Sequence, residues 1–397
     1  MEKQFLIEYQ LARTDLKTLA LFCKVVDNFG DIGICWRLAR QLHQEHQIKV
    51  QLWVDDLASF KRICPEVSCD MDQQMIEGVD ICFWRNQDIP FTAAEISDIV
   101  IEFFACDIPP AYIQAMTEHD PKPVWFNLEG LTAEDWVEGC HTLPSSHPQL
   151  PLTKYFFFPG FNQRTGGLMF EEDLEQRRQN FANDQSARDH FLRQLGAQDQ
   201  DLEAFKVSLF CYPHAPILPL LEAWSASETP HFCLVPQGVA QASIETFFGT
   251  SADVGKTLTK GQLRLLIISF VPQNDYDKLL WACDFNFVRG EDSFVRAQWA
   301  QRPFVWHIYP QDEQLHHKKL RAFLNTFKPA TNTLRSLNLA WNEVLPNLQW
   351  AEAWKQIRCE CAEIEQESGL WAQEMHKNGD LSANLLKFAR ALRQNHS

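Results

Sequence analysis

Residues 19–46 read LALFCKVVDNFGDIGICWRLARQLHQEH, and they contain the clearest indication of the fold of the chain. Residues 19–26 form an apolar run with one lysine, which predicts a buried strand. Residues 32–46 carry apolar side chains at helical spacing among Arg and Gln, which predicts a helix. A short acidic loop with two glycines lies between them. A strand, a loop and a helix in this order indicate the start of a parallel sheet that helices cover.

The same alternation continues through the first half of the chain. A Pro- and Ser-rich stretch at residues 141–152, HTLPSSHPQLPL, has little periodicity and predicts a linker. We therefore expect a Rossmann-like domain over residues 1–150. Its further strands are predicted at residues 49–54, 81–84, 99–105 and 124–128, with a helix over residues 109–118.

The second half repeats the pattern and predicts a second Rossmann-like domain over residues 151–397. From residue 334 onward, four helix-like segments occur without strands. The expected fold class is α/β, with two doubly wound domains that face a central cleft. The predicted strands are 155–158, 206–212, 231–235, 263–270, 285–288 and 304–308, and the predicted helices are 187–194, 216–225, 275–282, 293–300 and 313–327.

Composition narrows the class of function. A length of 397 residues is too great for one compact core, and the net charge of −16 argues against a nucleic-acid binder, which would need a basic face. No apolar stretch approaches the roughly 20 residues of a membrane span. The N-terminus lacks the apolar core of a signal peptide. Most of the twelve cysteines lie in apolar runs without a CxxC pair. We therefore expect a reduced, cytoplasmic protein that binds neither nucleic acid nor membrane.

The loop between the first strand and helix is a candidate site. Asp31 has the right residue type and position to cap the helix. A cap does not explain Asp27, nor the glycines Gly30 and Gly33 on either side of Asp31. Glycine permits a close backbone approach to a ligand, and two carboxylates four residues apart can converge on one group. A metal is another role for the pair.

A second candidate loop, residues 289–293 (RGEDS), ends a predicted strand and opens a helix. Helix N-terminal amides attract anions, and Arg289 and Ser293 add a cation and a hydroxyl donor. Glu291 would repel a phosphate, so its better role is to accept hydrogen bonds from ribose hydroxyls. Together these groups predict a nucleoside diphosphate site that needs no metal. Phe270, Gln273 and Tyr212 end or follow neighbouring strands and could hold the base.

Other motifs carry less weight. Residues 249–257, GTSADVGKT, resemble a phosphate-binding loop, but the first glycine is one residue too early and no strand precedes it. We interpret this stretch as an exposed loop. His307, His316 and His317 do not define a metal-ligand set. No GxGxxG follows the first strand, and no GxSxG is present.

The joint pattern resembles the EarP family of protein-arginine rhamnosyltransferases. The resemblance runs from about residue 19 to the C-terminal helices, and the first eighteen residues look like an extension. It rests on seven segments of the sequence: residues 22–33 (FCKVVDNFGDIG), 36–40 (WRLAR), 158–161 with 165–168 (FPGF and TGGL), 289–293 with 296–299 (RGEDS and RAQW), and 306–311 (WHIYPQ).

The resemblance implies a GT-B fold and transfer of rhamnose, with inversion, from dTDP-β-L-rhamnose to an arginine of translation elongation factor P. It implies Asp31 as general base, with Asp27 and Glu291 also catalytic, an acceptor-binding first domain and a donor-binding second domain. No cofactor or metal is expected. The residues expected to bind the donor are Asn28, Phe29, Gly30, Gly33, Tyr212, Phe270, Gln273, Arg289, Gly290, Asp292 and Ser293.

Two alternatives remain at this point. One is a GT-B enzyme that uses another nucleotide sugar on a glycan or a small molecule, which the residues alone barely distinguish from the first hypothesis. The other is a scaffold without activity that binds a partner protein. A scaffold gives no reason for two acidic residues and an anion-binding loop to occur in one chain.

Overall fold

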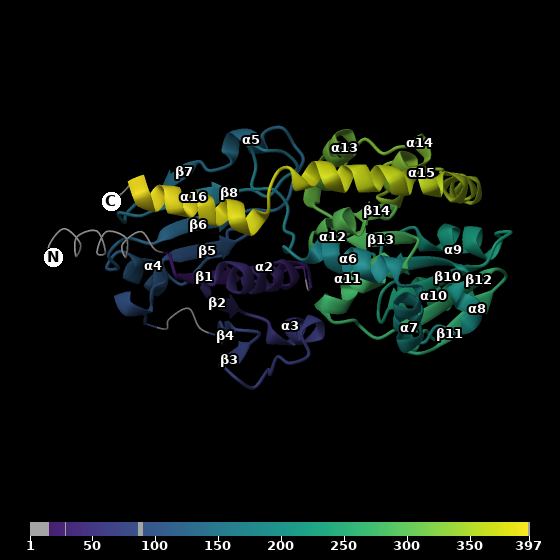
Figure 1. Cartoon of the computed structure of the whole chain (residues 1–397), viewed down its shortest axis with the longest axis horizontal. Coiled ribbons are helices and arrows are strands. Elements are labelled where there is room, and N and C mark those ends of the chain that lie inside the picture. The colour runs from purple at the N-terminus through teal and green to yellow at the C-terminus, as the bar shows by residue number, and fades with distance from the viewer. Residues whose placement is uncertain (1–15, 28, 86–89, 396–397) are drawn as a thin grey trace. The chain divides into compact units, whose positions relative to one another are not determined.

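The computed structural model describes residues 16–27, 29–85 and 90–395, which divide into two compact units (Figure 1). The first unit contains the chain up to Glu172 and the segment from Met375 onward. The second unit spans Asp173–Glu374. The predicted N-terminal extension and Asn28 lie outside the described residues, apart from residues 16–18, of which Thr18 already begins the first strand.

The first unit is built on an eight-stranded sheet with the order β3-β4-β2-β1-β5-β6-β8-β7. The two edge strands β3 and β7 run antiparallel to their neighbours, and the other pairs are parallel. The strands are β1 (Thr18–Cys23), β2 (Lys49–Val54), β3 (Gln73–Ile76), β4 (Val79–Phe83), β5 (Ile99–Phe103), β6 (Val124–Leu128), β7 (Pro144–Ser146) and β8 (Thr153–Phe157).

Helices cover this sheet. The last helix of the chain, α16, belongs to the first unit (Figure 1), and its Phe388 packs against Phe126 of β6 and Tyr155 of β8 at ring distances of 6.1 and 5.7 Å. The helices of this unit are α2 (Gly30–His46), α3 (Leu57–Ile63), α4 (Pro110–Met116), α5 (Val137–Cys140) and α16 (Leu381–Asn395), with a 3-10 turn η1 (Ala93–Glu95).

The second unit is built on a six-stranded sheet with the order β11-β12-β10-β9-β13-β14, in which only the β11–β12 pair is antiparallel. Large aromatic side chains fill its core, and the rings of Trp354 and Trp224 are 5.3 Å apart. The strands are β9 (Phe205–Leu209), β10 (His231–Pro236), β11 (Thr257–Lys260), β12 (Leu263–Ile268), β13 (Phe285–Arg289) and β14 (Phe304–His307).

The helices of the second unit include a long one, α15, that ends near the boundary of the unit. They are α6 (Leu174–Asn183), α7 (Gln185–Leu195), α8 (Asp199–Leu202), α9 (Ile217–Ser225), α10 (Gln241–Phe248), α11 (Gln273–Ala282), α12 (Asp292–Ala300), α13 (Leu315–Phe327), α14 (Asn332–Trp341) and α15 (Trp350–His376), with a 3-10 turn η2 (Asp312–Gln314).

The structure differs from the sequence-based organisation in three places, one of which is that the segment from Met375 onward, with α16, belongs to the first unit and not to the second. Residues 141–152 are not a linker, because they contain β7, and β8 after them joins the first sheet beside β6. The first unit therefore extends to Glu172 rather than ending at residue 150. A proline can begin an edge strand, where its missing N–H costs no ladder hydrogen bond. The tail after residue 334 holds three helices rather than four, since α15 is continuous over 27 residues.

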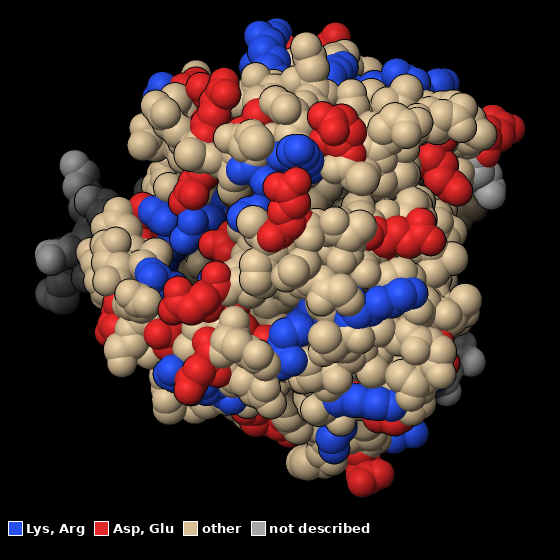
Figure 2. Space-filling model, turned by 90° about the vertical axis from the view of Figure 1, so that its right-hand side faces the viewer, with Lys and Arg blue, Asp and Glu red and all other residues tan. Residues whose placement is uncertain are grey.

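The surface charges, the cysteines and the helices can be compared with what the composition predicts. On the face shown in Figure 2, acidic and basic side chains are interspersed among the described residues. All twelve cysteines lie in the described part of the chain, where each is a free thiol and most are buried. No helix among the described residues is long and apolar enough to cross a membrane.

Candidate active site

The first candidate loop lies at the point where the strand order of the first sheet reverses. β1 pairs with β2 on one side and with β5 on the other, so the chain moves away from β1 in both directions. Open α/β sheets bind ligands in the crevice that this reversal creates, beyond the carboxyl ends of the strands. The loop that follows β1 and precedes α2 occupies this position, as the sequence predicted.

Asp31 does not cap α2, contrary to the simplest structural expectation. The helix begins at Gly30, and the N-cap residue is Phe29, whose side chain makes no cap hydrogen bond. Asp31 is therefore in the first turn, and its Oδ2 accepts hydrogen bonds from the backbone N–H groups of Val26 at 2.7 Å and Asp27 at 2.8 Å. The carboxylate thus folds back onto the loop that precedes the helix.

The surroundings of Asp31 make its carboxylate more basic than an ordinary one. Asp31 is 4% exposed, and this burial is the main reason why its pKa is raised. The two backbone hydrogen bonds oppose the shift, while the charges of Asp27 and Asp55 add to it. Both hydrogen bonds from described residues end on Oδ2, so Oδ1 is the atom available for a substrate proton. A buried carboxylate of raised pKa suits a general base.

Asp55 is a neighbour that the sequence reasoning missed. It follows β2 directly, and its Oδ1 accepts a hydrogen bond of 2.8 Å from the N–H of Val25 in the same loop. The sequence does contain an indication of this neighbour. A polar residue that directly follows the strand next to β1 lies at the same carboxyl edge of the sheet. Asp55 thus holds the backbone at Val25, next to the N–H groups of Val26 and Asp27 that Asp31 holds.

Gly30 is required for steric reasons. Its N–H donates to the carbonyl of Asp27 at 2.6 Å, which closes a tight turn. A Cβ at this position would lie 2.8 Å from Oδ2 of Asp27. One turn further along, the N–H of Gly33 donates to the carbonyl of Phe29 at 2.9 Å. Gly30 therefore shapes the loop, while Gly33 lies in the first turn of the helix that Phe29 precedes as N-cap residue.

The second candidate loop lies at the corresponding reversal in the second sheet. β9 has β10 on one side and β13 on the other, and the order continues outward from both. The loops after β9 and β13 meet at this carboxyl edge, which is again the expected ligand position. Tyr212 lies in the loop after β9 and Arg289 is the last residue of β13, and both are predicted donor-site residues.

Arg289 is held as a fixed cation by the loop after β9. Its Nη1 donates to the carbonyl of Cys211 at 3.0 Å. The guanidinium carbon lies 4.3 Å from the ring centre of Phe210 and 4.8 Å from that of Tyr212, so both rings contribute cation–π attraction. An arginine oriented in this way is prepared to bind phosphate oxygens.

The turn between β13 and α12 depends on Gly290 and Ser293. Gly290 has a φ of 64°, its N–H donates to the carbonyl of His307 at 3.1 Å, and its carbonyl accepts from Nε1 of Trp306 at 2.7 Å. The Ser293 hydroxyl accepts from the N–H of Arg289 at 3.0 Å and donates to the Arg289 carbonyl. Ser293, predicted as a donor to a ligand, thus closes the loop in this structure. Glu291 is the N-cap residue of α12 and makes no side-chain cap.

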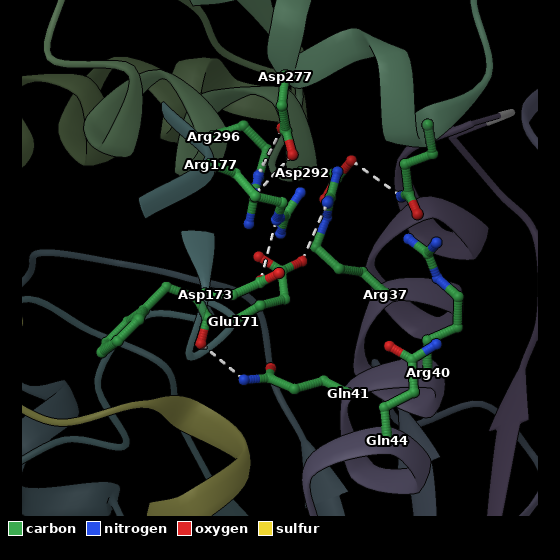
Figure 3. A network of polar contacts seen from close by, with 12 residues as sticks. Arg37, Arg40, Gln41, Gln44, Glu171, Asp173, Arg177, Asp277, Asp292 and Arg296 are labelled. Carbon is green, nitrogen blue, oxygen red and sulfur yellow. Dashed lines mark hydrogen bonds and ion pairs between the residues drawn. The ribbon is translucent and has the colours of Figure 1, made fainter. Parts of the chain in front are cut away.

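A buried ion pair and a hydrogen bond fix the start of α12 against α11. Arg296 of α12 donates to both carboxylate oxygens of Asp277 on α11, at 2.8 and 2.6 Å, and the two side chains are 1% and 2% exposed (Figure 3). Nε2 of Gln273, the first residue of α11, donates to Asp292 at 3.2 Å. The helix N-terminus that would meet an anion is therefore held rigidly.

The remaining predicted residue, Phe270, reaches this group through an aromatic contact. Its ring packs edge to face against Phe210, with centroids 6.0 Å apart. The structure thus brings together, in the second unit, the predicted residues Tyr212, Phe270, Gln273, Arg289, Gly290, Asp292 and Ser293. Sequence reasoning did not find His214 or Tyr309, both of which pack against Tyr212.

The motifs set aside from sequence are not ligand loops or metal sites here. Residues 249–256 connect α10 to β11, which begins at Thr257, and Nζ of Lys256 bonds to Thr250 and Ser251 rather than facing a helix N-terminus. His307 is buried on β14, while His316 and His317 lie on α13. Within the described residues, no group of three or more His, Cys, Asp or Glu side chains is placed to hold a metal ion.

Two Rossmann-like units in one chain, each with a chemically equipped loop at the reversal of its strand order, define the class: an α/β glycosyltransferase of the GT-B type. The chain belongs to the EarP family. The family model, described as Elongation-Factor P (EF-P) rhamnosyltransferase EarP, matches residues 19–390. The fold class and the resemblance inferred from the sequence are thereby confirmed.

Similar proteins support the same family. The chain is 45% identical over 379 residues to a protein-arginine rhamnosyltransferase of Pseudomonas putida. The matched region covers 94% of this chain and 98% of the relative. It is 43% identical to one of Pseudomonas aeruginosa, with 93% and 97% covered. A solved structure concerning EarP-mediated arginine glycosylation of translation elongation factor EF-P is 33% identical, covers 94% of this chain and 99% of that chain, and has a TM-score of 0.65. The alternative of another glycosyl donor and acceptor is not favoured.

Proposed function

We propose that this protein transfers L-rhamnose from dTDP-β-L-rhamnose to an arginine side chain of translation elongation factor P, with inversion at the anomeric carbon. Membership of the EarP family supports the choice of reaction. The observation that carries the chemistry is Asp31, a buried carboxylate of raised pKa at the reversal of a Rossmann-like sheet. We further propose that the reaction takes place in the cytoplasm and needs no metal or cofactor.

In the proposed reaction, a terminal nitrogen of the acceptor guanidinium forms a bond to the anomeric carbon of rhamnose. The bond from that carbon to the β-phosphate oxygen breaks, and dTDP leaves with the electron pair. Oδ1 of Asp31 takes the proton that the guanidinium nitrogen loses. A guanidinium has a pKa above about 12 and no free lone pair on its terminal nitrogens. A carboxylate that both orients it and removes its proton as the C–N bond forms therefore lowers the barrier.

The other residues of the first loop support this role. Asp27 is four residues before Asp31 and would hold the acceptor fork together with it. The tight turn at Gly30 and the helix start at Phe29 and Gly33 keep the backbone close to the reacting groups. In the proposal, the first unit provides the acceptor-binding residues.

The second unit provides the donor-binding residues in the proposal. Arg289, held over two aromatic rings, would neutralise the charge that develops on the leaving diphosphate, together with the first-turn amides of α12. Glu291 would accept hydrogen bonds from sugar hydroxyls. Tyr212, Phe270 and Gln273 would hold the nucleoside, and Gly290, Asp292 and Ser293 shape the loop around it.

The test is intact-mass analysis of elongation factor P after incubation with this protein and dTDP-rhamnose. We expect a gain of one deoxyhexose on an arginine, and no gain when that arginine is replaced by lysine. An unchanged mass of the wild-type factor would refute the assigned reaction while leaving the fold and family as they are.

A further inference from the structure

Two histidines at the carboxyl edge of the second sheet have no role in the reaction described so far. His307 is the last residue of β14 and is fully buried, whereas His214 lies in the loop after β9 and is exposed. Their Nε2 atoms are 3.0 Å apart, which is a hydrogen-bond distance. One of the two nitrogens must therefore donate and the other accept.

A backbone N–H group determines which of the two Nε2 atoms is the donor. The N–H of Tyr212 points at Nδ1 of His307 at 3.2 Å, and a backbone N–H can only donate. Nδ1 of His307 is therefore unprotonated, and in the neutral ring its proton is on Nε2. This Nε2–H donates to Nε2 of His214. The proton of the neutral His214 ring must then be on Nδ1.

His307 also resists taking up an additional proton. A proton on His307 would face the N–H of Tyr212, and a proton on Nε2 of His214 would face the N–H of His307. Burial lowers the pKa of His307 well below its ordinary value, and the charges of His214, Arg289 and His316 act in the same direction. Two neutral rings with one defined arrangement of protons follow from this geometry.

Tyr212 holds the His214 ring beside the fixed arginine. The rings of His214 and Tyr212 are stacked, with centroids 6.1 Å apart and planes at 8°. The same Tyr212 ring lies 4.8 Å from the guanidinium carbon of Arg289. In the described part of the chain, the only hydrogen bond of the His214 ring is the one to His307, so its Nδ1–H is available to a ligand.

We propose that His214 is a further donor-binding residue, whose neutral Nδ1–H donates to a diphosphate oxygen of the bound nucleotide, and that His307 is a positioning residue that sets this tautomer. The inference rests on the proposed function in one respect, namely that the second unit binds a nucleoside diphosphate. It adds a neutral donor beside the cation, where a second positive charge would be repelled by Arg289.

The tautomers can be measured without any ligand. Nitrogen-15 NMR of the full-length protein labelled at histidine should show His214 protonated at Nδ1 and His307 protonated at Nε2. In His307→Phe, the His214 ring should lose this preference, an effect that a purely structural role of His307 would not produce. A doubly protonated ring in the wild-type pair, or a proton on Nε2 of His214, would overturn the proposal.

Binding of dTDP to amide variants tests the contact itself. Asparagine places its N–H₂ near the position of Nδ1, whereas glutamine places it near Nε2. We expect His214→Ala and His214→Gln to weaken dTDP binding about fivefold to tenfold in calorimetry, and His214→Asn to retain most of the affinity. Thymidine, which lacks phosphates, should bind all four proteins equally.

The outcomes separate this proposal from the function on which it rests. If the wild-type protein does not bind dTDP, the proposed function fails, whereas the tautomer measurement still stands. If the wild-type protein binds dTDP and His214→Ala binds it equally well, the role of His214 is refuted alone. An equal loss of thymidine affinity in His214→Ala would place the contact on the nucleoside and overturn the assignment to phosphate.

Discussion

The two candidate loops occupy equivalent positions in their sheets but differ in the charge that they present. Each lies at a reversal of strand order and each leads into a helix whose N-cap side chain makes no hydrogen bond to the helix. In the first loop, backbone N–H groups are used by the protein's own carboxylate, Asp31. In the second, a carbonyl and two rings hold the cation Arg289.

The same architecture thus supports two kinds of chemistry. A helix N-terminus attracts an anion. The first unit supplies that anion itself, as the first-turn residue Asp31, and so becomes a basic site for a proton. The second unit leaves the position to an external anion and adds an arginine. The loops, and not the sheets, therefore set the chemistry of each unit.

Removal of the charge of Asp31 should have the largest effect on the contrast between the two loops. We expect Asp31→Asn to lower turnover roughly 10²-fold or more, because an amide cannot accept the proton. The affinity for dTDP should not change, since Asp31 is proposed to take the acceptor proton and is not among the residues proposed to hold dTDP. Turnover of the factor by mass spectrometry and calorimetry with dTDP would measure the two quantities.

A matched control is Asp56→Asn. Asp56 caps α3 through the N–H groups of Ala58 and Ser59, and asparagine caps a helix about as well. Turnover should be unchanged in this variant. Near-normal turnover in Asp31→Asn would remove Asp31 as the base.

Removal of Arg289 tests the opposite half of the comparison. We expect Arg289→Ala to weaken dTDP binding about tenfold to a hundredfold, the range for loss of a charge-assisted hydrogen bond. Arg302→Ala, which breaks an ion pair with Glu365 in the same unit, serves as the control and should bind dTDP normally. An unchanged affinity in Arg289→Ala would contradict its role at the phosphates.

Much of both loops could be predicted from sequence because each lies next to its own strand and helix. The strand before Asp27 and the strand before Gly290 were recognisable as apolar runs, and ligand loops follow such strands. Residues joined only by the fold could not be found in this way. His214 and His307 are 93 positions apart in sequence, and no local pattern relates them.

The assignment of β8 to the first sheet is a second feature that the sequence alone could not predict. Its sequence, TKYFF, predicts a strand but not the neighbour with which it pairs. Pairing depends on β6, which lies before the Pro- and Ser-rich stretch that suggested a linker. The capping role expected of Asp31 failed for a local reason, since the helix starts one residue before it.

A buried histidine in the second unit should make this unit sensitive to acid. Burial lowers the pKa of His231 to about 4, and Nε1 of Trp354 donates to its Nε2 at 2.8 Å. In the unfolded chain a histidine binds a proton near pH 6.5. Between these values the unfolded state holds more protons, so stability decreases as the pH falls. The cost is about 2 kcal/mol at pH 5.

Thermal unfolding at pH 8 and pH 5 would measure this effect. In His231→Leu the decrease in midpoint between the two conditions should be smaller than in the wild type, whatever the midpoint at pH 8. The control is His190→Leu, which changes an exposed histidine on α7 and should retain the wild-type decrease. An equal decrease in His231→Leu would show that other groups cause the acid sensitivity.

The smallest expected effects separate the two loop glycines, which are needed for different reasons. Gly290 has a φ of 64°, so Gly290→Ala forces an L-residue into the left-handed region at a cost of about 1 kcal/mol. The unfolding midpoint should fall by about 2–4 °C for a unit of this size.

Gly30 has no such strain, but a Cβ there would lie 2.8 Å from Oδ2 of Asp27. This carboxylate is the flexible end of a side chain, so Gly30→Ala should leave the midpoint nearly unchanged and lower turnover severalfold, because Asp27 is displaced from the acceptor. Normal turnover in Gly30→Ala would mean that the position of the Asp27 carboxylate does not matter, and the acidic half of the comparison would then rest on Asp31 alone.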